Sequence, residues 1–180
     1  MKRDGLAGVS TGARALPGGL GAPHACHRRI PRYCRGLRAL MLHVRACGQS
    51  REAQMAAHLL LLFFDNEVPQ HCLDEEHDLF PALAGALAGG GPAGVREFTR
   101  HAIEQHRALA AEWAPLRLPL EQLASGRNIL LPCSAVDAFA SRWSEQVERE
   151  DSGLLSIVSL ANRGPPITPL PQETATPRPQ

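Results

Sequence analysis

Apolar residues recur at steps of three and four in four stretches of the chain, the spacing of one face of an α-helix. The pattern predicts four helices, over residues 26–46, 51–84 and 93–116 and from Pro132 or Ser134 to residue 161. Ser50 precedes the second stretch as a candidate N-cap, and Pro69 within it predicts a kink. No stretch shows the strict alternation of a half-buried strand, so the sequence predicts an all-α fold.

Short breaks separate the predicted helices. The glycines at 89–91 and Pro92 form one such break. Because short connections make consecutive helices antiparallel, we expect an up-down four-helix bundle. Residues 1–23 lack periodicity and residues 163–180 are rich in proline, so we expect both ends to be disordered and residues 24–162 to form one domain.

Composition narrows the class of protein further. The chain has 180 residues, 44% hydrophobic and 21% charged, which suits one globular domain. A net charge of +1 offers no field to attract nucleic acid or an anionic membrane, and the longest apolar run, residues 59–64, is too short to span a bilayer. Five cysteines without a CxxC pair argue against a disulfide framework. We therefore expect a cytoplasmic protein with neither a nucleic-acid nor a membrane partner; its oligomeric state stays open.

The inward face of each predicted helix is apolar except for one or two histidine, glutamate or glutamine side chains. The four faces consist of His27, Ile30, Cys34, Leu37, Met41 and Val44; Leu60, Phe64, Val68, His71, Glu75 and Leu79; Ala102, His106, Leu109, Trp113 and Leu116; and Val136, Phe139, Trp143, Gln146, Glu150, Leu154 and Val158. No lysine or arginine occupies these faces, and a buried carboxylate is costly without a compensating positive charge. A bound metal cation would supply that charge. The alternative is a metal-free polar core in which the histidines bond to their neighbours.

The spacing of the polar residues indicates which metal would fit. His71 and Glu75 are four residues apart, as are Gln146 and Glu150, so each pair projects from one helix face. Imidazole and carboxylate ligands without thiolate favour iron or manganese in the core of a helical bundle. One carboxylate from each of two helices is a usual way to hold two irons close together.

Four segments resemble the hemerythrin-like, or HHE cation-binding, domains: residues 26–30, 63–83, 104–109 and 139–155. The most specific is the H-x-x-x-E-x-x-x-L-F-P motif at residues 71–81, and the resemblance covers residues 24–162. It implies a hemerythrin-like four-helix bundle with a di-iron centre, in which the two glutamates bridge the irons. The ligands that it implies are His27, His71, Glu75, His106 and Glu150.

Three positions depart from the family pattern. Gln146 stands where the family has a histidine on the fourth helix, and Cys72 replaces the second histidine of the HH run. Pro31 closely follows His27, and its ring would clash with the carbonyl of His27, so we expect the first helix to begin near His27. A site with one iron, or a lost site, is therefore the alternative to two irons.

The resemblance implies several functions, because family members serve as oxygen carriers, sensors and iron-handling proteins. We expect a protein that binds or senses dioxygen or nitric oxide, or handles iron, with apolar walls from Leu79, Phe80 and Trp113. The alternatives are an oxidoreductase that uses the same centre and a structural bundle without metal. Whether the chain is an enzyme stays open, and Glu76 and Asp74 are expected beside the site or in solvent.

Overall fold

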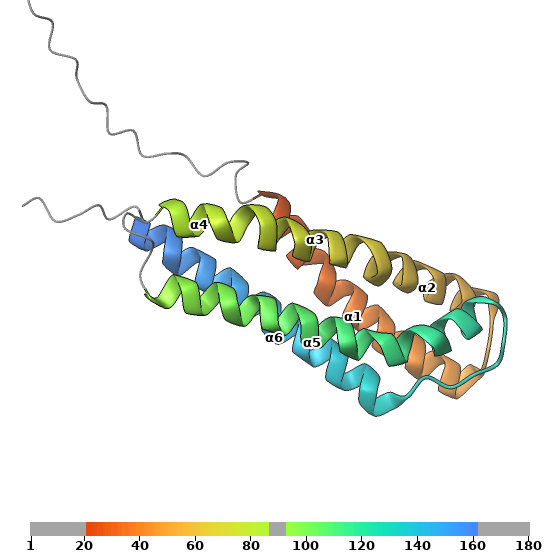
Figure 1. Ribbon diagram of the computed structural model, residues 1–180. Helices are drawn as coiled ribbons and strands as arrows, with labels where there is room; N and C mark the ends of the chain where they lie inside the picture. The colour runs from red at the N-terminus through yellow and green to blue at the C-terminus, as the bar shows by residue number, and fades with distance from the viewer. Residues whose placement is uncertain (1–20, 87–92, 162–180) are drawn as a thin grey trace, which may run out of the picture.

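Four helical rods run side by side in the computed structural model, which describes residues 21–86 and 93–161 (Figure 1). The first, third and fourth rods are single helices: α1 (Gly21–Cys47), α5 (Ala93–Ala124) and α6 (Cys133–Ala161). The second rod is α2 (Arg51–Leu62), η1 (Phe63–Glu67), α3 (Val68–Asp74), η2 (Glu75–Leu79) and α4 (Phe80–Ala86), where η1 and η2 are π-helical turns. The predicted loop at residues 89–92 and the predicted disordered ends lie outside the described residues, except for residues 21–23, which were predicted to be disordered but belong to α1.

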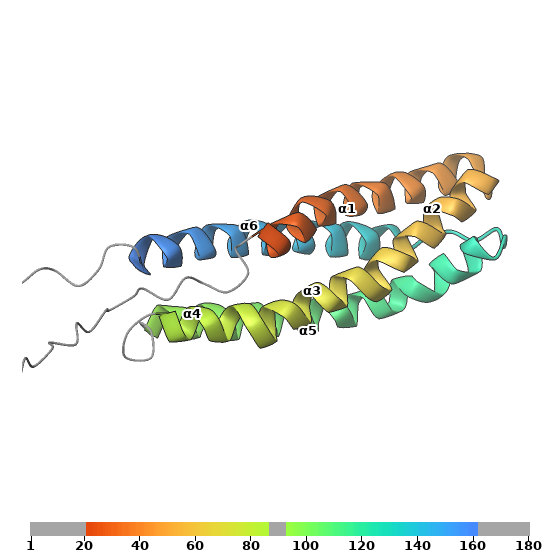
Figure 2. The ribbon, with the colours of Figure 1, turned by 90° about the horizontal axis from the view of Figure 1, so that it is seen from above.

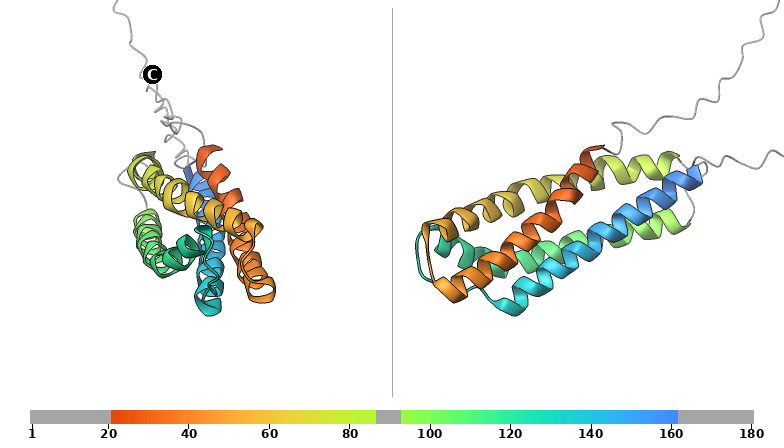
Figure 3. Two further views of the ribbon diagram at one scale, coloured as in Figure 1. Left: turned by 90° about the vertical axis from the view of Figure 1, so that its right-hand side faces the viewer. Right: turned by 180° about the vertical axis from the view of Figure 1, so that it is seen from behind.

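The rods form an antiparallel up-down bundle, as the sequence predicted. Helix α1 lies against α2, α3 and α6, and α5 lies against α2, α4 and α6 (Figures 2 and 3). The part of the chain that the structure describes contains no strand, which confirms the all-α class. None of its helices combines the length and the apolar character that crossing a membrane demands.

A tight connection joins α1 to α2. Gly48 adopts the left-handed conformation (φ 75°), and its N–H donates to the carbonyl of Val44 at 2.9 Å, which ends α1. Two residues later the Ser50 side chain accepts a hydrogen bond from the Ala53 N–H at 3.2 Å. This confirms the predicted N-cap and explains why α2 begins at Arg51.

The second rod bends around its π-helical turns (Figure 2). Pro69 lies at the start of α3, directly after η1, where the Val68 N–H donates to the carbonyl of Phe63, five residues back. Because proline has no N–H to donate, the wider π turn before it lets the helix continue. The kink predicted at Pro69 therefore takes the form of a π turn just before it.

The second π turn shifts the inward face by one position. After Glu75 the next fully buried residue is Phe80, five residues on, whereas Leu79 is only half-buried. Steps of three and four had predicted Leu79 on this face, which is wrong because a π turn adds one residue per turn. A second difference lies on α6, which is a continuous α-helix: Ile157, three residues after Leu154, is buried, and the predicted Val158 is half-buried.

Proline does not end the helices where the sequence predicted. Helix α1 begins at Gly21 and continues through Pro31, so the prediction that it begins near His27 is wrong. Ile30 and Cys34, on either side of this proline, are buried, and their packing offsets the lost backbone hydrogen bond. His27 consequently lies inside a helix and not at its end.

Helix α5 also runs past its predicted end at Leu116. It passes Pro115 and Pro119 and stops at Ala124. Leu116, Leu120 and Leu123 are all fully buried on one helix face. Burial of these leucines, each contributing about 1.5–3 kcal/mol, offsets a cost of about 3 kcal/mol for each proline.

Two apolar clusters fill the interior, one on each side of a layer of polar side chains. The larger cluster extends from Leu37 and Phe64 to Trp113 and Phe139. The smaller one consists of Phe80, Leu83, Val95, Ala102, Leu154 and Ile157. The polar layer between them is therefore shielded from water at both ends, which makes any charge within it costly.

Two half-buried glycines, one beside open space and one packed against a phenyl ring, test the packing of the helices. Gly153 on α6 lies so close to Phe98 that an added Cβ would overlap the phenyl ring, whereas a Cβ on Gly36 of α1 meets no described atom within 4 Å. We expect Gly36→Ala to raise the free energy of unfolding by about 0.5–1 kcal/mol. Gly153→Ala should lower it by about 1 kcal/mol or more, because Phe98 must move. Denaturant unfolding measures both, and an equal gain in the two variants would contradict this packing.

Candidate metal centre

The five predicted ligands converge in the polar layer, although they come from four different rods. They are His27 of α1, His71 of α3, Glu75 of η2, His106 of α5 and Glu150 of α6. Each side chain is at most 6% exposed. Their convergence follows from the buried face of each helix, since every one of the five lies on the inward stripe that the sequence predicted.

Glu75 lies at the centre of the cluster. Its Oε1 is 3.3 Å from Nε2 of His27 and 3.6 Å from Nε2 of His71. Its Oε2 is 3.4 Å from Nε2 of His106. The two oxygens of one carboxylate thus face imidazoles on opposite sides.

Glu150 spans the same two sides from the fourth rod. Its Oε2 is 3.4 Å from Nε2 of His27, and its Oε1 is 3.0 Å from Nε2 of His106. The ligand atoms form two compact groups, His27 with His71 and Glu75, and Glu75 with His106 and Glu150, each within 4.8 Å. Because Glu75 belongs to both groups, the geometry suits two cations that share a carboxylate.

Several polar atoms of the cluster lack a hydrogen bond. Within the described residues, Nε2 of His71, both carboxylate oxygens of Glu75 and Oε2 of Glu150 are buried without a hydrogen-bond partner. A buried polar atom left in this state costs about 1–3 kcal/mol, and more when it is charged. The donor set therefore fits a bound cation, which would satisfy all of these atoms at once.

Two further carboxylates hold the histidines in place. Oε1 of Glu76 is 2.9 Å from Nδ1 of His106, and Oδ1 of Asp151 is 2.7 Å from Nδ1 of His27. Such contacts fix the ring orientation and leave Nε2 directed at Glu75 and Glu150, where it could bind a cation. The sequence placed Glu76 beside the site or in solvent, and the structure places it beside the site. The sequence pattern did not identify Asp151, whose only signal was its position directly after Glu150.

Gln146, which replaces a family histidine, is fully buried but engaged with the protein. Its Nε2 donates to Oε1 of Glu150 at 2.6 Å, and its Oε1 accepts from Arg149 at 2.9 Å. The side of the cluster that contains His106 therefore has one imidazole, and the side that contains His27 has two.

Cys72 is half-buried beside the cluster and packs against the larger apolar core. Burial raises the pKa of its thiol, and its hydrogen bond with His106 opposes that effect. The thiol is therefore protonated at neutral pH, in keeping with the absence of Cys72 from both candidate ligand groups.

The histidines of the metal-free cluster differ in charge. Burial lowers the pKa of His27 and His106, but their neighbours outweigh it. Glu150 and Glu75, with oxygens 3.4 and 3.3 Å from Nε2 of His27, raise its pKa to about 10. Contacts with Cys72 and Glu150 raise the pKa of His106 to about 11. Burial and the charge of His27 lower the pKa of His71 to about 4. Two imidazolium ions thus compensate the charge of the buried carboxylates when no metal is bound.

The two glutamates also differ from each other. Burial raises the pKa of Glu75, and His27, whose Nε2 is 3.3 Å from Oε1 of Glu75, acts in the opposite direction. For Glu150 burial acts in the same direction, but the hydrogen bond with His106 and the proximity of His27 outweigh it and lower the pKa to about 2. Glu150 therefore stays ionised in the metal-free cluster, whereas burial favours the neutral form of Glu75.

The fold and this buried cluster define a four-helix metal-binding protein. A family model described as the hemerythrin HHE cation-binding domain matches residues 23–158. The chain therefore belongs to the hemerythrin HHE cation-binding family, as its motifs indicated. It is also 26% identical over 128 residues to an uncharacterized protein of Haemophilus influenzae, a match that covers 71% of this chain and 72% of the relative. No solved structure matches the chain.

Replacing the shared carboxylate tests the centre. In Glu75→Gln the side chain keeps its shape but loses its charge, so we expect metal loading to be abolished. Saturating metal should stabilise the unmodified protein by about 2.7 kcal/mol at one hundred times the dissociation constant, and this gain should vanish in the variant. Glu148→Gln, an exposed position on α6, is the matched control and should retain it. Unchanged metal content in Glu75→Gln would refute the ligand role of Glu75.

Metal uptake should release protons. His27 and His106 are protonated at pH 7 in the metal-free cluster, and each must lose its proton before Nε2 can bind a cation. We expect about two protons to be released per chain from these histidines, and the affinity for metal to fall as the pH is lowered. Calorimetric titration at one pH in buffers of different ionisation enthalpy counts these protons. A titration without proton release would contradict the charge pattern.

Proposed function

We propose that this protein holds a di-iron centre that binds a small diatomic molecule, dioxygen or nitric oxide, for transport or sensing. The observation that carries the proposal is the position of Glu75, whose two oxygens face His27 and His71 on one side and His106 on the other. A carboxylate in that position can bridge two metals, and Glu150 spans the same two sides.

The donor set favours iron. His27, His71 and Glu75 offer two imidazoles and one carboxylate, the combination typical of non-haem ferrous sites with open coordination positions. Neither candidate group includes a cysteine, so the thiolate ligands common in structural zinc sites play no part within the described residues. All five cysteines are free, which supports a reducing cytoplasm as the location of the protein.

The surroundings favour a small apolar ligand. Each candidate group contains only three side chains, so coordination positions remain for a ligand that the protein does not supply. The buried ring of Phe80 stacks over His106 with 6.4 Å between the ring centroids. An apolar cover of this kind disfavours water relative to a diatomic gas. When bound, the irons would supply the electrons for reversible ligand binding, and buried apolar side chains such as Phe80 would limit the access of water.

The chain's single tyrosine supports binding over catalysis. Oxidoreductase chemistry at such a centre needs a positioned proton donor. Tyr33 instead stacks on Phe63, with 3.7 Å between the ring centroids, and its hydroxyl accepts a hydrogen bond from Arg29. The tyrosine is thus engaged away from the ligand set.

Iron stoichiometry, measured with a visible spectrum of the same sample, tests the proposal. After anaerobic loading with ferrous ion we expect up to two irons per chain, with the His106 side filling last because it has a single imidazole. An absorption band should appear with dioxygen or nitric oxide and disappear when the gas is removed. Gln146→His adds an imidazole to the weaker side and should bring iron occupancy closer to two per chain.

The outcomes separate the competing functions. A protein that stays free of iron after loading is a structural bundle, and steady consumption of the gas with a reductant indicates an oxidoreductase. Gln146→His without a gain in iron would contradict the assignment of Gln146 to the metal site. Loading with manganous ion in parallel shows whether the centre prefers iron.

A further inference from the structure

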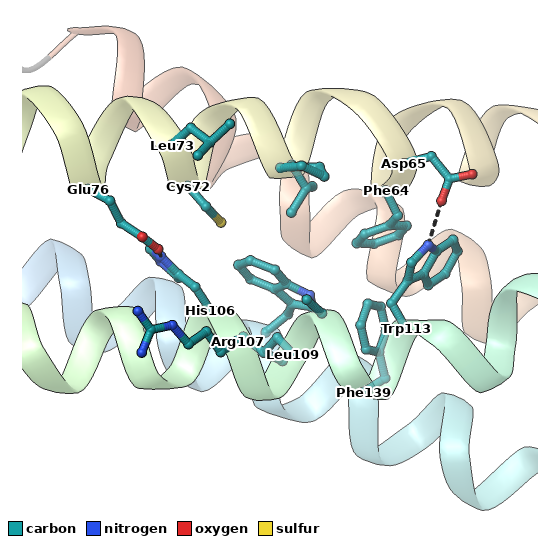
Figure 4. A pocket seen from close by; sticks show the side chains of 14 residues that line it. Phe64, Asp65, Cys72, Leu73, Glu76, His106, Arg107, Leu109, Trp113 and Phe139 are labelled. Carbon is teal, nitrogen blue, oxygen red and sulfur yellow. Dashed lines mark hydrogen bonds and ion pairs between the residues drawn. The ribbon is translucent and has the colours of Figure 1, made fainter.

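A cavity of about 400 Å³ lies between the second rod and α5, on the His106 side of the metal centre. Figure 4 shows Cys72 and His106 toward one end of it and Phe64, Trp113 and Phe139 toward the other. The aromatic walls are deeply buried, whereas the rim is exposed: Leu73 is 47% exposed and Phe139 only 1%. The cavity is thus a pocket with an apolar floor that opens to the surface.

The cavity is too large for a diatomic ligand alone. A water molecule occupies about 30 Å³ in the liquid, so a volume of about 400 Å³ equals roughly a dozen water molecules. Dioxygen and nitric oxide are comparable in size to water. Pockets for organic ligands span about 300–1,000 Å³ and are mostly apolar, with a few polar groups that orient the ligand. This cavity matches that class of site.

The acidic groups in the lining are already paired. Oδ1 of Asp65 accepts a hydrogen bond from the Trp113 indole at 2.7 Å, and Oδ2 pairs with Arg117 at 2.9 Å. Glu76 pairs with His106 at 2.9 Å. Neither carboxylate therefore leaves a net negative charge that would attract a cationic ligand.

Arg107 of α5 is a positively charged residue in the lining of the same cavity, and its side chain is exposed at the rim. Within the described residues its guanidinium takes part in no hydrogen bond or ion pair. A guanidinium presents a planar fork of donors that matches a carboxylate in two parallel hydrogen bonds. The cavity therefore combines an aromatic floor with one uncompensated cation at its mouth.

We propose that this cavity binds an apolar organic monocarboxylate, with its apolar part against the aromatic walls and its carboxylate at Arg107. The ligand would lie beside His106 but would not require a metal. The site is therefore additional to the proposed di-iron function and can succeed or fail independently of it.

Tryptophan fluorescence gives a direct measurement. The chain has two tryptophans, and both Trp113 and Trp143 line the cavity. We expect phenylbutanoate, added to the full-length metal-free protein, to change the emission saturably. The neutral analogue phenylbutanol should bind roughly tenfold more weakly, a difference of about 1.4 kcal/mol for the lost ionic contact. Equal affinities for the two probes, or an unsaturable response, would overturn the proposal.

Three variants of α5 make the test specific. Arg107→Gln should reduce the affinity for phenylbutanoate to that for phenylbutanol and leave phenylbutanol binding unchanged. Ala110→Phe places a ring in the lining and should prevent binding of both probes. Ala111→Phe, at the next, equally exposed position outside the lining, is the matched control and should retain both affinities.

Two results would contradict the assignment. Undiminished phenylbutanoate binding in Arg107→Gln would show that the guanidinium does not bind the carboxylate. Equal losses of affinity in Ala110→Phe and Ala111→Phe would show that the probes do not occupy the cavity. Thermal unfolding of each variant confirms that it is folded. Iron loading of the same variants shows separately whether the metal centre is intact.

Discussion

The cost of burying two carboxylates between four helices is the constraint on which this structure depends. Glu75 and Glu150 are at most 1% exposed, and apolar clusters close the polar layer on both sides. Without metal, imidazolium ions at His27 and His106 supply the compensating charge. Within the described residues, several buried ligand atoms still lack a hydrogen bond. A bound cation could contact these atoms as well as balance the charge, so it fits the layer better than the imidazolium ions do.

The placement of the two glutamates follows a common local arrangement. In the second rod Glu75 faces the centre and the next residue, Glu76, binds Nδ1 of His106. In the fourth rod Glu150 faces the centre and the next residue, Asp151, binds Nδ1 of His27. Each adjacent pair thus gives one carboxylate to the cluster of candidate ligands and one to a histidine of a neighbouring rod. This arrangement ties the four rods together at one level of the bundle.

The two halves of the centre are nevertheless unequal. The half with His27 has two imidazoles, whereas the half with His106 has one, because Gln146 is held by Glu150 and Arg149. The apolar cavity also lies on the His106 side. His71, in the half with two imidazoles, borders a second cavity of about 430 Å³. The two halves therefore differ in their nitrogen ligands and in the kind of space beside them, and the aromatic walls are on the side with one imidazole.

The sequence by itself determined the four helices, the inward faces and the five candidate ligands, because helical periodicity and the cost of burying charge are both local properties of the chain. It placed His71 and Glu75 on one face and identified Gln146 as the departure from the family pattern. Only the tertiary structure decided that helices continue through Pro31, Pro115 and Pro119, since packing against neighbouring rods outweighs local propensity there. The shift from Leu79 to Phe80, the pairing of Asp151 with His27 and the cavity beside Arg107 also depend on contacts between distant segments. No spacing along one helix can reveal such contacts.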